Sequence, residues 1–158
     1  MYERILVPLD GSKIGEAALP SVEKLISKLT PNVKTEVTLL QVIPSMTHYV
    51  AAGEASVKIS YSEKEIELIK KRAKSYLDKA AKEFKSKGAA VKTKVTTGSP
   101  AEEIIKVADE TKADLVTMST HGRHGLSRWA FGSVTDKVLR AGNFPVLVVR
   151  APKGTENI

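Results

Sequence analysis

The sequence contains no cysteine among its 158 residues. Disulfide bridges, thiolate metal ligands and cysteine nucleophiles are therefore excluded. No run of apolar residues approaches the roughly 18 that a membrane-spanning helix needs. The short strand-like stretch after the charged N-terminus is too brief for the apolar core of a signal peptide. We therefore expect a cytoplasmic protein without a membrane segment.

Two kinds of ligand pattern are also missing. The glycine-lysine-serine or -threonine pattern of a P-loop does not occur, so the P-loop lysine and its magnesium ligand are absent. No group of histidine, aspartate and glutamate residues has the spacing typical of a metal site. Aromatic residues make up 5% of the chain. This is too few to predict a stacking surface for bases.

The net charge of +7 is confined to one part of the sequence. Between Lys58 and Lys94 there are twelve basic and five acidic residues, and the rest of the chain is balanced. Such a segment forms either a basic surface for nucleic acid or an acidic partner, or the solvated face of a lysine-rich helix. Lysine outnumbers arginine there, so we favour the solvated helix and do not expect nucleic-acid binding.

Strand-like and helical patterns alternate along the whole chain. Strands are expected at 2–9, 35–43, 89–96, 115–119 and 143–150, and helices at 13–29, 62–88, 99–111 and 133–141. Residues 45–61 show no clean period and are expected to form a long loop, and 151–158 a polar tail. The alternation predicts an α/β fold: a single domain over 1–158 with an open parallel sheet and helices on both faces.

Two loops carry residues suited to a ligand. Gly122 and Gly132 follow the fourth strand, and Ser133 is expected to cap the last helix, whose first N–H groups favour an anion. This loop forms either a phosphate cradle or a tight structural turn. After the first strand, Asp10 either reaches a ribose hydroxyl or a phosphate-bound Mg²⁺, or folds back on its own turn. The loops converge if the first and fourth strands are neighbours.

Several stretches carry a family resemblance over nearly the whole chain. They are Ile5 to Ser12, Gly98 to Pro100, Asn143 to Val149, and a glycine pattern in which Gly122 is followed after nine residues by Gly132 and Ser133. The chain resembles the universal stress protein family, whose nucleotide-binding signature has a further glycine three residues before the first of these. Here that position is Ser119.

The resemblance implies a Rossmann-like fold, similar to adenine nucleotide alpha hydrolases, with five strands in the order 3-2-1-4-5. It also implies ATP with Mg²⁺ or Mn²⁺ as ligand, Asp10 as the metal ligand, and a homodimer paired through the fifth strand. By matching position, the nucleotide would be surrounded by Pro8, Leu9, Asp10, Val42, Ser119, Gly122, Arg123, Gly132, Ser133 and Val134.

The effect of serine at position 119 on nucleotide binding depends on the backbone conformation there. A side chain at this position would be strained if the backbone has positive φ, whereas a serine that only ends a strand adds a hydroxyl. We expect nucleotide binding to be retained, in a regulatory homodimer of the stress response with an unidentified signalling partner. The alternatives are an interaction module without nucleotide and a slow nucleotide hydrolase. We assign no catalytic residue, because His121 and His124 are better explained as loop residues.

Overall fold

A computed structural model describes residues 2–28, 34–43, 47–52, 55–86, 89–120, 132–152 and 154–155. Five parallel strands form its main sheet in the order β5-β2-β1-β6-β7. They are β1 (Arg4–Pro8), β2 (Glu36–Ile43), β5 (Ala90–Thr97), β6 (Leu115–Thr120) and β7 (Val146–Arg150). In chain order these are the five predicted strands, so the expected 3-2-1-4-5 arrangement is confirmed.

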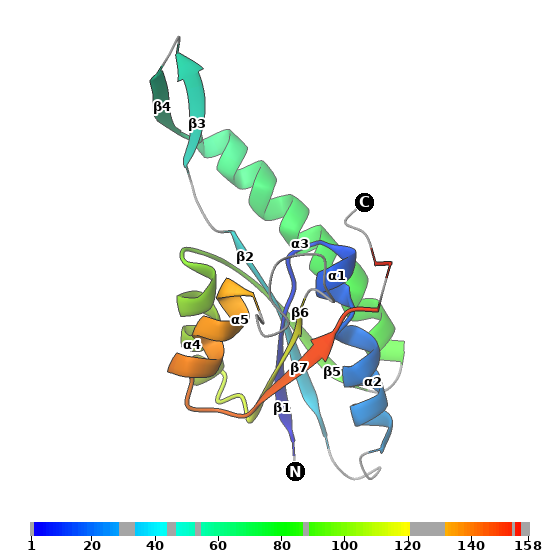
Figure 1. Ribbon diagram of the computed structural model, residues 1–158. Coiled ribbons are helices and arrows are strands. Elements are labelled where there is room, and N and C mark those ends of the chain that lie inside the picture. Colours follow the sequence, from blue (N-terminus) through cyan, green and yellow to red (C-terminus); the bar gives the residue numbers. More distant parts are fainter. Residues whose placement is uncertain are drawn as a thin grey trace.

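Helices cover both faces of the sheet (Figure 1). One face is covered by α2 (Leu19–Lys28) and α3 (Glu63–Ser86), and the other by α4 (Pro100–Glu110) and α5 (Ser133–Ala141). A short helix, α1 (Lys13–Glu16), lies between β1 and α2. Among the described residues no helix is long and apolar enough to cross a membrane.

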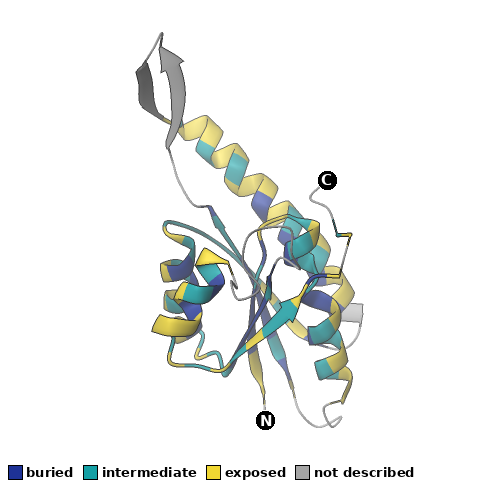
Figure 2. Cartoon of the chain, viewed as in Figure 1, coloured by how far each residue is buried: buried dark blue, intermediate teal, exposed yellow. Residues whose placement is uncertain are grey.

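The central strand β1 is buried on both sides, as its unbroken apolar sequence requires (Figure 2). Ile5 and Val7 pack with Leu77 and Phe84 of α3. Leu6 faces the other layer. On that side it joins a cluster formed by Leu40, Ile104, Val107, Val116 and Val138. The two clusters fix the strand ends that carry the site.

The helix expected over 13–29 is instead two helices. The first helix ends at Glu16 and the second begins at Leu19, with a turn at Ala17 and Ala18 between them. Pro20 lies in the first turn of α2, where its missing N–H costs nothing. In the middle of a longer helix the same proline would remove a hydrogen bond and clash with the preceding turn. Pro20 therefore explains the break, and the sequence prediction missed it.

The segment expected to be a long loop contains an antiparallel pair of strands, which corrects the prediction for 45–61. β3 (Thr47–Ala52) pairs with β4 (Ala55–Ser60), from Thr47 opposite Ser60 to Ala52 opposite Ala55. This two-stranded sheet lies at the outer end of α3, away from the main sheet (Figure 1). The sequence signal was Gly53 between two short runs containing β-branched residues.

Serine residues stand at the starts of three helices, where their side chains can cap the first turn. Ser12 caps α1 by accepting the Gly15 N–H at 2.9 Å. Ser62 and Glu65 form a capping box before α3: the Ser62 N–H donates to the Glu65 carboxylate at 2.8 Å, and Ser62 Oγ accepts the Glu65 N–H at 3.3 Å. Ser99 is the N-cap of α4 with Pro100 first, although its side chain does not cap the backbone.

Candidate functional site

A cavity of about 610 Å³ opens at the carboxyl ends of β1, β2 and β6. Such a position, where the strand order reverses, is where open α/β sheets bind ligands. Eight of the ten predicted site residues line it: Pro8, Leu9, Asp10, Val42, Ser119, Gly132, Ser133 and Val134. The other two, Gly122 and Arg123, lie outside the described residues, as do His121 and His124. The residues after β1 and the described residues on either side of 121–131 therefore border one cavity.

Other residues of the lining were not predicted. They are Ile14, Gly15, Gln41, Ile43, Ile69, Pro100, Ile104, Met118, Thr120 and Thr135. Most are apolar and carry the same sequence pattern as core residues, so nothing in the sequence separates them from the core. Gly15 differs, because it is buried inside a helix that begins directly after the predicted loop. A buried glycine in a helix signals a close approach by another group.

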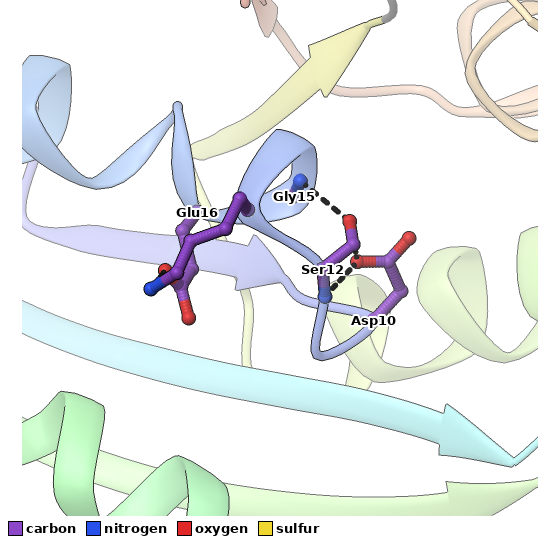
Figure 3. A network of polar contacts seen from close by, with 5 residues as sticks. Asp10, Ser12, Gly15 and Glu16 are labelled. Carbon is purple, nitrogen blue, oxygen red and sulfur yellow. Dashed lines mark hydrogen bonds and ion pairs between the residues drawn. The ribbon is translucent and has the colours of Figure 1, made fainter. Parts of the chain in front are cut away.

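Asp10 folds back on its own turn with one of its two carboxylate oxygens. Oδ1 accepts the backbone N–H of Ser12 at 2.9 Å and the hydroxyl of Ser12 at 2.6 Å (Figure 3). Oδ2 points away from this turn. The structural role considered for Asp10 is therefore present, and it leaves the second oxygen directed away from the turn.

Gly15 brings helix α1 close to this carboxylate. A Cβ on Gly15 would overlap Oδ1 of Asp10. The Gly15 N–H donates to Ser12 Oγ, whose own hydroxyl donates to Asp10. The loop after β1 and the first turn of α1 thus form one hydrogen-bonded unit, in which a side chain at position 15 would displace the Asp10 carboxylate.

The main chain at the end of β2 faces the cavity. The Leu40 carbonyl points toward β1, since it accepts the Leu9 N–H at 2.7 Å. The Ile43 carbonyl points the other way and accepts the Gly98 N–H at 3.0 Å. Because main-chain groups alternate sides along a strand, the N–H and C=O of Val42 point toward β1. The pairing of β1 with β2 ends at Pro8 and Leu40, so these groups are directed at the opening.

Ser119 lies in neither a turn nor a strained backbone conformation. It lies in β6 opposite Val149, and its φ is not positive. The replacement of the signature glycine is therefore compatible with the backbone. Its hydroxyl donates to the carbonyl oxygen of Gly15 at 3.0 Å. The hydroxyl thus ties β6 to α1.

The start of α5 differs from the prediction in one residue. Gly132, not Ser133, is the N-cap, and it has φ +87° and ψ 150°. This conformation suits only glycine, so a serine would be strained at position 132. Asp136 N–H donates to the Gly132 carbonyl at 2.9 Å, and Ser133 begins the helix. The N–H groups of Ser133, Val134 and Thr135 precede the first intrahelical bond and belong to residues that line the cavity.

Two groups outside the cavity lining have shifted pKa values. The phenol of Tyr76 is packed near Glu16 and Asp10, and burial, followed by the two carboxylates, raises its pKa well above the ordinary value. On the face of the sheet covered by α4 and α5, Lys137 Nζ lies 2.8 Å from Glu102 Oε1. Its hydrogen bond and positive charge lower the pKa of the Glu102 carboxyl. In the described part of the chain, no three His, Asp or Glu side chains come together as a metal site.

This arrangement defines a doubly wound, Rossmann-like α/β protein with a ligand cavity at the switch point of its sheet. The family model of the universal stress protein family matches residues 1–150. The chain belongs to the universal stress protein family.

Individual relatives agree with this assignment. Universal stress protein MJ0531 of Methanocaldococcus jannaschii is 32% identical over 154 residues, covering 97% of this chain and 85% of the relative. Universal stress protein MJ0577 of the same organism is 36% identical over 159 residues, covering 95% and 96%. The solved structure of MJ0577 superposes with a TM-score of 0.73 at 31% identity, covering 98% of this chain and 99% of that chain.

The fold also extends to a plant member of the family. A universal stress protein from Arabidopsis thaliana, solved with AMP bound, has a TM-score of 0.63 at 16% identity. The match covers 98% of this chain and 99% of the plant chain. At 16% identity, the match with the plant protein shows a shared fold and nothing further.

Proposed function

We propose that this chain binds an adenine nucleotide, ATP, in the cavity at the ends of β1, β2 and β6. The observation that carries the proposal is the convergence of the β1 loop and the start of α5 on one cavity. The Arabidopsis protein of the same fold holds AMP, which supports an adenine nucleotide as the class of ligand.

The base and the ribose would be held on the β1–β2 side. The N–H and C=O of Val42, which point toward β1 beyond the end of the β1–β2 pairing, would form a donor–acceptor pair suited to the edge of adenine. Pro8 and Leu9 supply apolar contact beside them. The Oδ2 atom of Asp10 points away from its turn and can accept a hydrogen bond from a ribose hydroxyl or bind a phosphate-bound Mg²⁺ or Mn²⁺.

The phosphates would lie at the start of α5. The N–H groups of Ser133 and Val134, the Ser133 hydroxyl and the positive end of the helix dipole favour an anion there. The main chain of Ser119 adds a further donor from β6. Gly122 and Arg123 belong to this part of the site by the family resemblance.

A metal ion fits this site only as a companion of the phosphates. Asp10 is a hard oxygen ligand of the kind that Mg²⁺ prefers, and among the described residues no group of three or more histidine, aspartate and glutamate side chains gathers at it. Magnesium is commonly bound by one or two carboxylates together with substrate phosphates. Asp10 would supply the protein ligand, and the nucleotide and water the rest.

The nucleotide-bound form would act as a regulatory homodimer in the stress response, paired through β7. This strand is at the edge of the sheet, and Leu147 in it is 38% exposed. An apolar edge strand invites pairing with a second copy. A cytoplasmic location and a signalling partner remain predictions.

Calorimetric titration with MgATP tests the proposal. Wild-type protein should bind with a measurable heat at micromolar to millimolar nucleotide. Asp10→Ala should weaken binding, whereas the control Lys24→Ala, at an exposed position of α2, should not. The absence of binding by wild-type protein up to millimolar MgATP would favour the interaction module without nucleotide. Formation of ADP or AMP with time, lost in Asp10→Ala, would instead favour the slow hydrolase.

A further inference from the structure

The hydroxyl of Ser119 satisfies a backbone group that the broken helix leaves open. α1 ends at Glu16 and α2 begins at Leu19, so the Gly15 carbonyl is not followed by a continuous helix that would supply an N–H four residues later. Ser119 Oγ donates to this carbonyl at 3.0 Å. The Ser119 side chain of β6 therefore caps the C-terminal end of α1.

From Gly15 the hydrogen bonds continue to the Asp10 carboxylate. Gly15 N–H donates to Ser12 Oγ at 2.9 Å, and the Ser12 hydroxyl donates to Asp10 Oδ1 at 2.6 Å. The same oxygen accepts the Ser12 N–H at 2.9 Å. With Oδ1 held in this way, Oδ2 is turned away from the loop (Figure 3). Ser119 is thus the outermost member of a chain of contacts that orients Asp10.

We propose that Ser119 is a positioning residue, which acts on nucleotide binding through Asp10 and not by a direct bond from its hydroxyl to phosphate. A serine hydroxyl has a single proton to donate. That proton is directed to Gly15 and is not available to a phosphate oxygen. This inference rests on the proposed nucleotide function, and it gives the serine that replaces the signature glycine a role of its own.

The serine and the aspartate should therefore be coupled. The experiment measures MgATP affinity by calorimetry for wild type, Ser119→Ala, Asp10→Ala and the double variant. Loss of one hydrogen bond of about 1 kcal/mol corresponds to roughly fivefold weaker binding by Ser119→Ala. Because its effect runs through Asp10, the double variant should bind no more weakly than Asp10→Ala alone. Fully additive losses would overturn the proposal.

Two further variants distinguish positioning from general loss of a hydroxyl. Ser119→Thr keeps the hydroxyl and suits a strand, so it should restore wild-type affinity. Ser27→Ala removes a similar hydroxyl-to-carbonyl bond, that of Ser27 to Lys24 at 3.0 Å on α2. It should leave affinity unchanged. If Ser119→Thr binds as weakly as Ser119→Ala, the hydrogen bond to Gly15 is not the cause.

A ligand-free measurement separates this inference from the proposed function. In hydrogen exchange, the Ser12 and Gly15 amides should exchange at least severalfold faster in Ser119→Ala than in wild type, because both belong to the chain of contacts. Unchanged exchange at both amides would overturn the positioning role even if MgATP binds. Conversely, faster exchange in a protein that does not bind MgATP would contradict the proposed function and, with it, the effect on binding, while leaving the contact chain intact.

Discussion

The carboxylate of Asp114 holds the backbone of Arg4 at the end of the sheet opposite the cavity. Asp114 Oδ1 accepts the Arg4 N–H at 3.1 Å, and Oδ2 accepts the Glu3 N–H at 3.0 Å. Asp114 precedes β6 directly, and Arg4 begins β1. The contact therefore aligns the starts of the two strands whose other ends carry Asp10 and Ser119.

Removing the Asp114 carboxylate should lower the free energy of unfolding, and the residues that line the cavity should be unaffected. We expect Asp114→Ala to reduce the free energy of unfolding by about 1–2 kcal/mol, since it removes bonds between a charged acceptor and two backbone donors. Urea denaturation monitored by circular dichroism measures the change. Asp109→Ala, an exposed position on α4, is the control and should change stability by less than about 0.5 kcal/mol. Equal losses in both variants would contradict the role of Asp114.

Gly15→Ala should damage the β1 loop by crowding. The added Cβ would overlap Asp10 Oδ1, so the carboxylate must leave its bonds to Ser12. We expect roughly tenfold weaker MgATP binding, equivalent to about 1.4 kcal/mol, together with a lower midpoint in thermal unfolding. Calorimetry and differential scanning calorimetry measure the two effects. Wild-type affinity in Gly15→Ala would show that the position of Asp10 does not matter for the ligand.

Tyr76 should make the protein less stable in alkali. Its folded-state pKa is raised above the value in the unfolded chain, about 10. The unfolded state therefore releases the phenolic proton first, and the free energy of unfolding falls as the pH rises above about 10. The stability difference between Tyr76→Phe and wild type should shift in favour of the variant between pH 8 and pH 11. Urea denaturation at the two pH values measures this, and a constant difference would contradict it.

Pairing through β7 should depend on its exposed apolar side chain. We expect Leu147→Glu to convert a dimer into a monomer, because like charges would face each other across the paired edges. Light scattering at micromolar concentration gives the mass. Leu139→Glu, another exposed leucine but on α5, is the matched control and should stay dimeric. A wild-type monomer would contradict the proposed homodimer, and a dimeric Leu147→Glu would exclude this edge as its interface.

Much of the fold follows from local sequence pattern, and the exceptions have physical reasons. Uninterrupted apolar strands such as Ile5 to Val7 can only lie in a sheet covered on both faces, and the alternation with helices then leaves few topologies. The break at Pro20 and the hairpin of β3 and β4 were missed because a single proline and a short strand pair give weak signals within longer patterns. Gly132 in place of Ser133 as the N-cap depends on a backbone conformation that residue type alone does not reveal.

The site was predictable to the extent that it follows strand ends. Asp10 and the loop after the fourth strand could be assigned to one crevice because parallel strands bring their carboxyl ends to one edge. Val42 and Ser119 were assigned to the nucleotide only through the family resemblance. The bond from Ser119 to Gly15 could not be predicted, since it joins residues 104 positions apart and depends on the break in the helix. Apolar lining residues such as Met118 carry the same pattern as the core.

The most direct test of the account is an amide NMR titration of the isotopically labelled protein with MgATP. The amide signals of Asp10, Val42 and Ser133 should shift with a common saturation curve. The signals of Asp114 and Glu36, at the opposite ends of their strands, should stay in place. An absence of shifts up to millimolar nucleotide, or shifts confined to the lysines of α3, would contradict it.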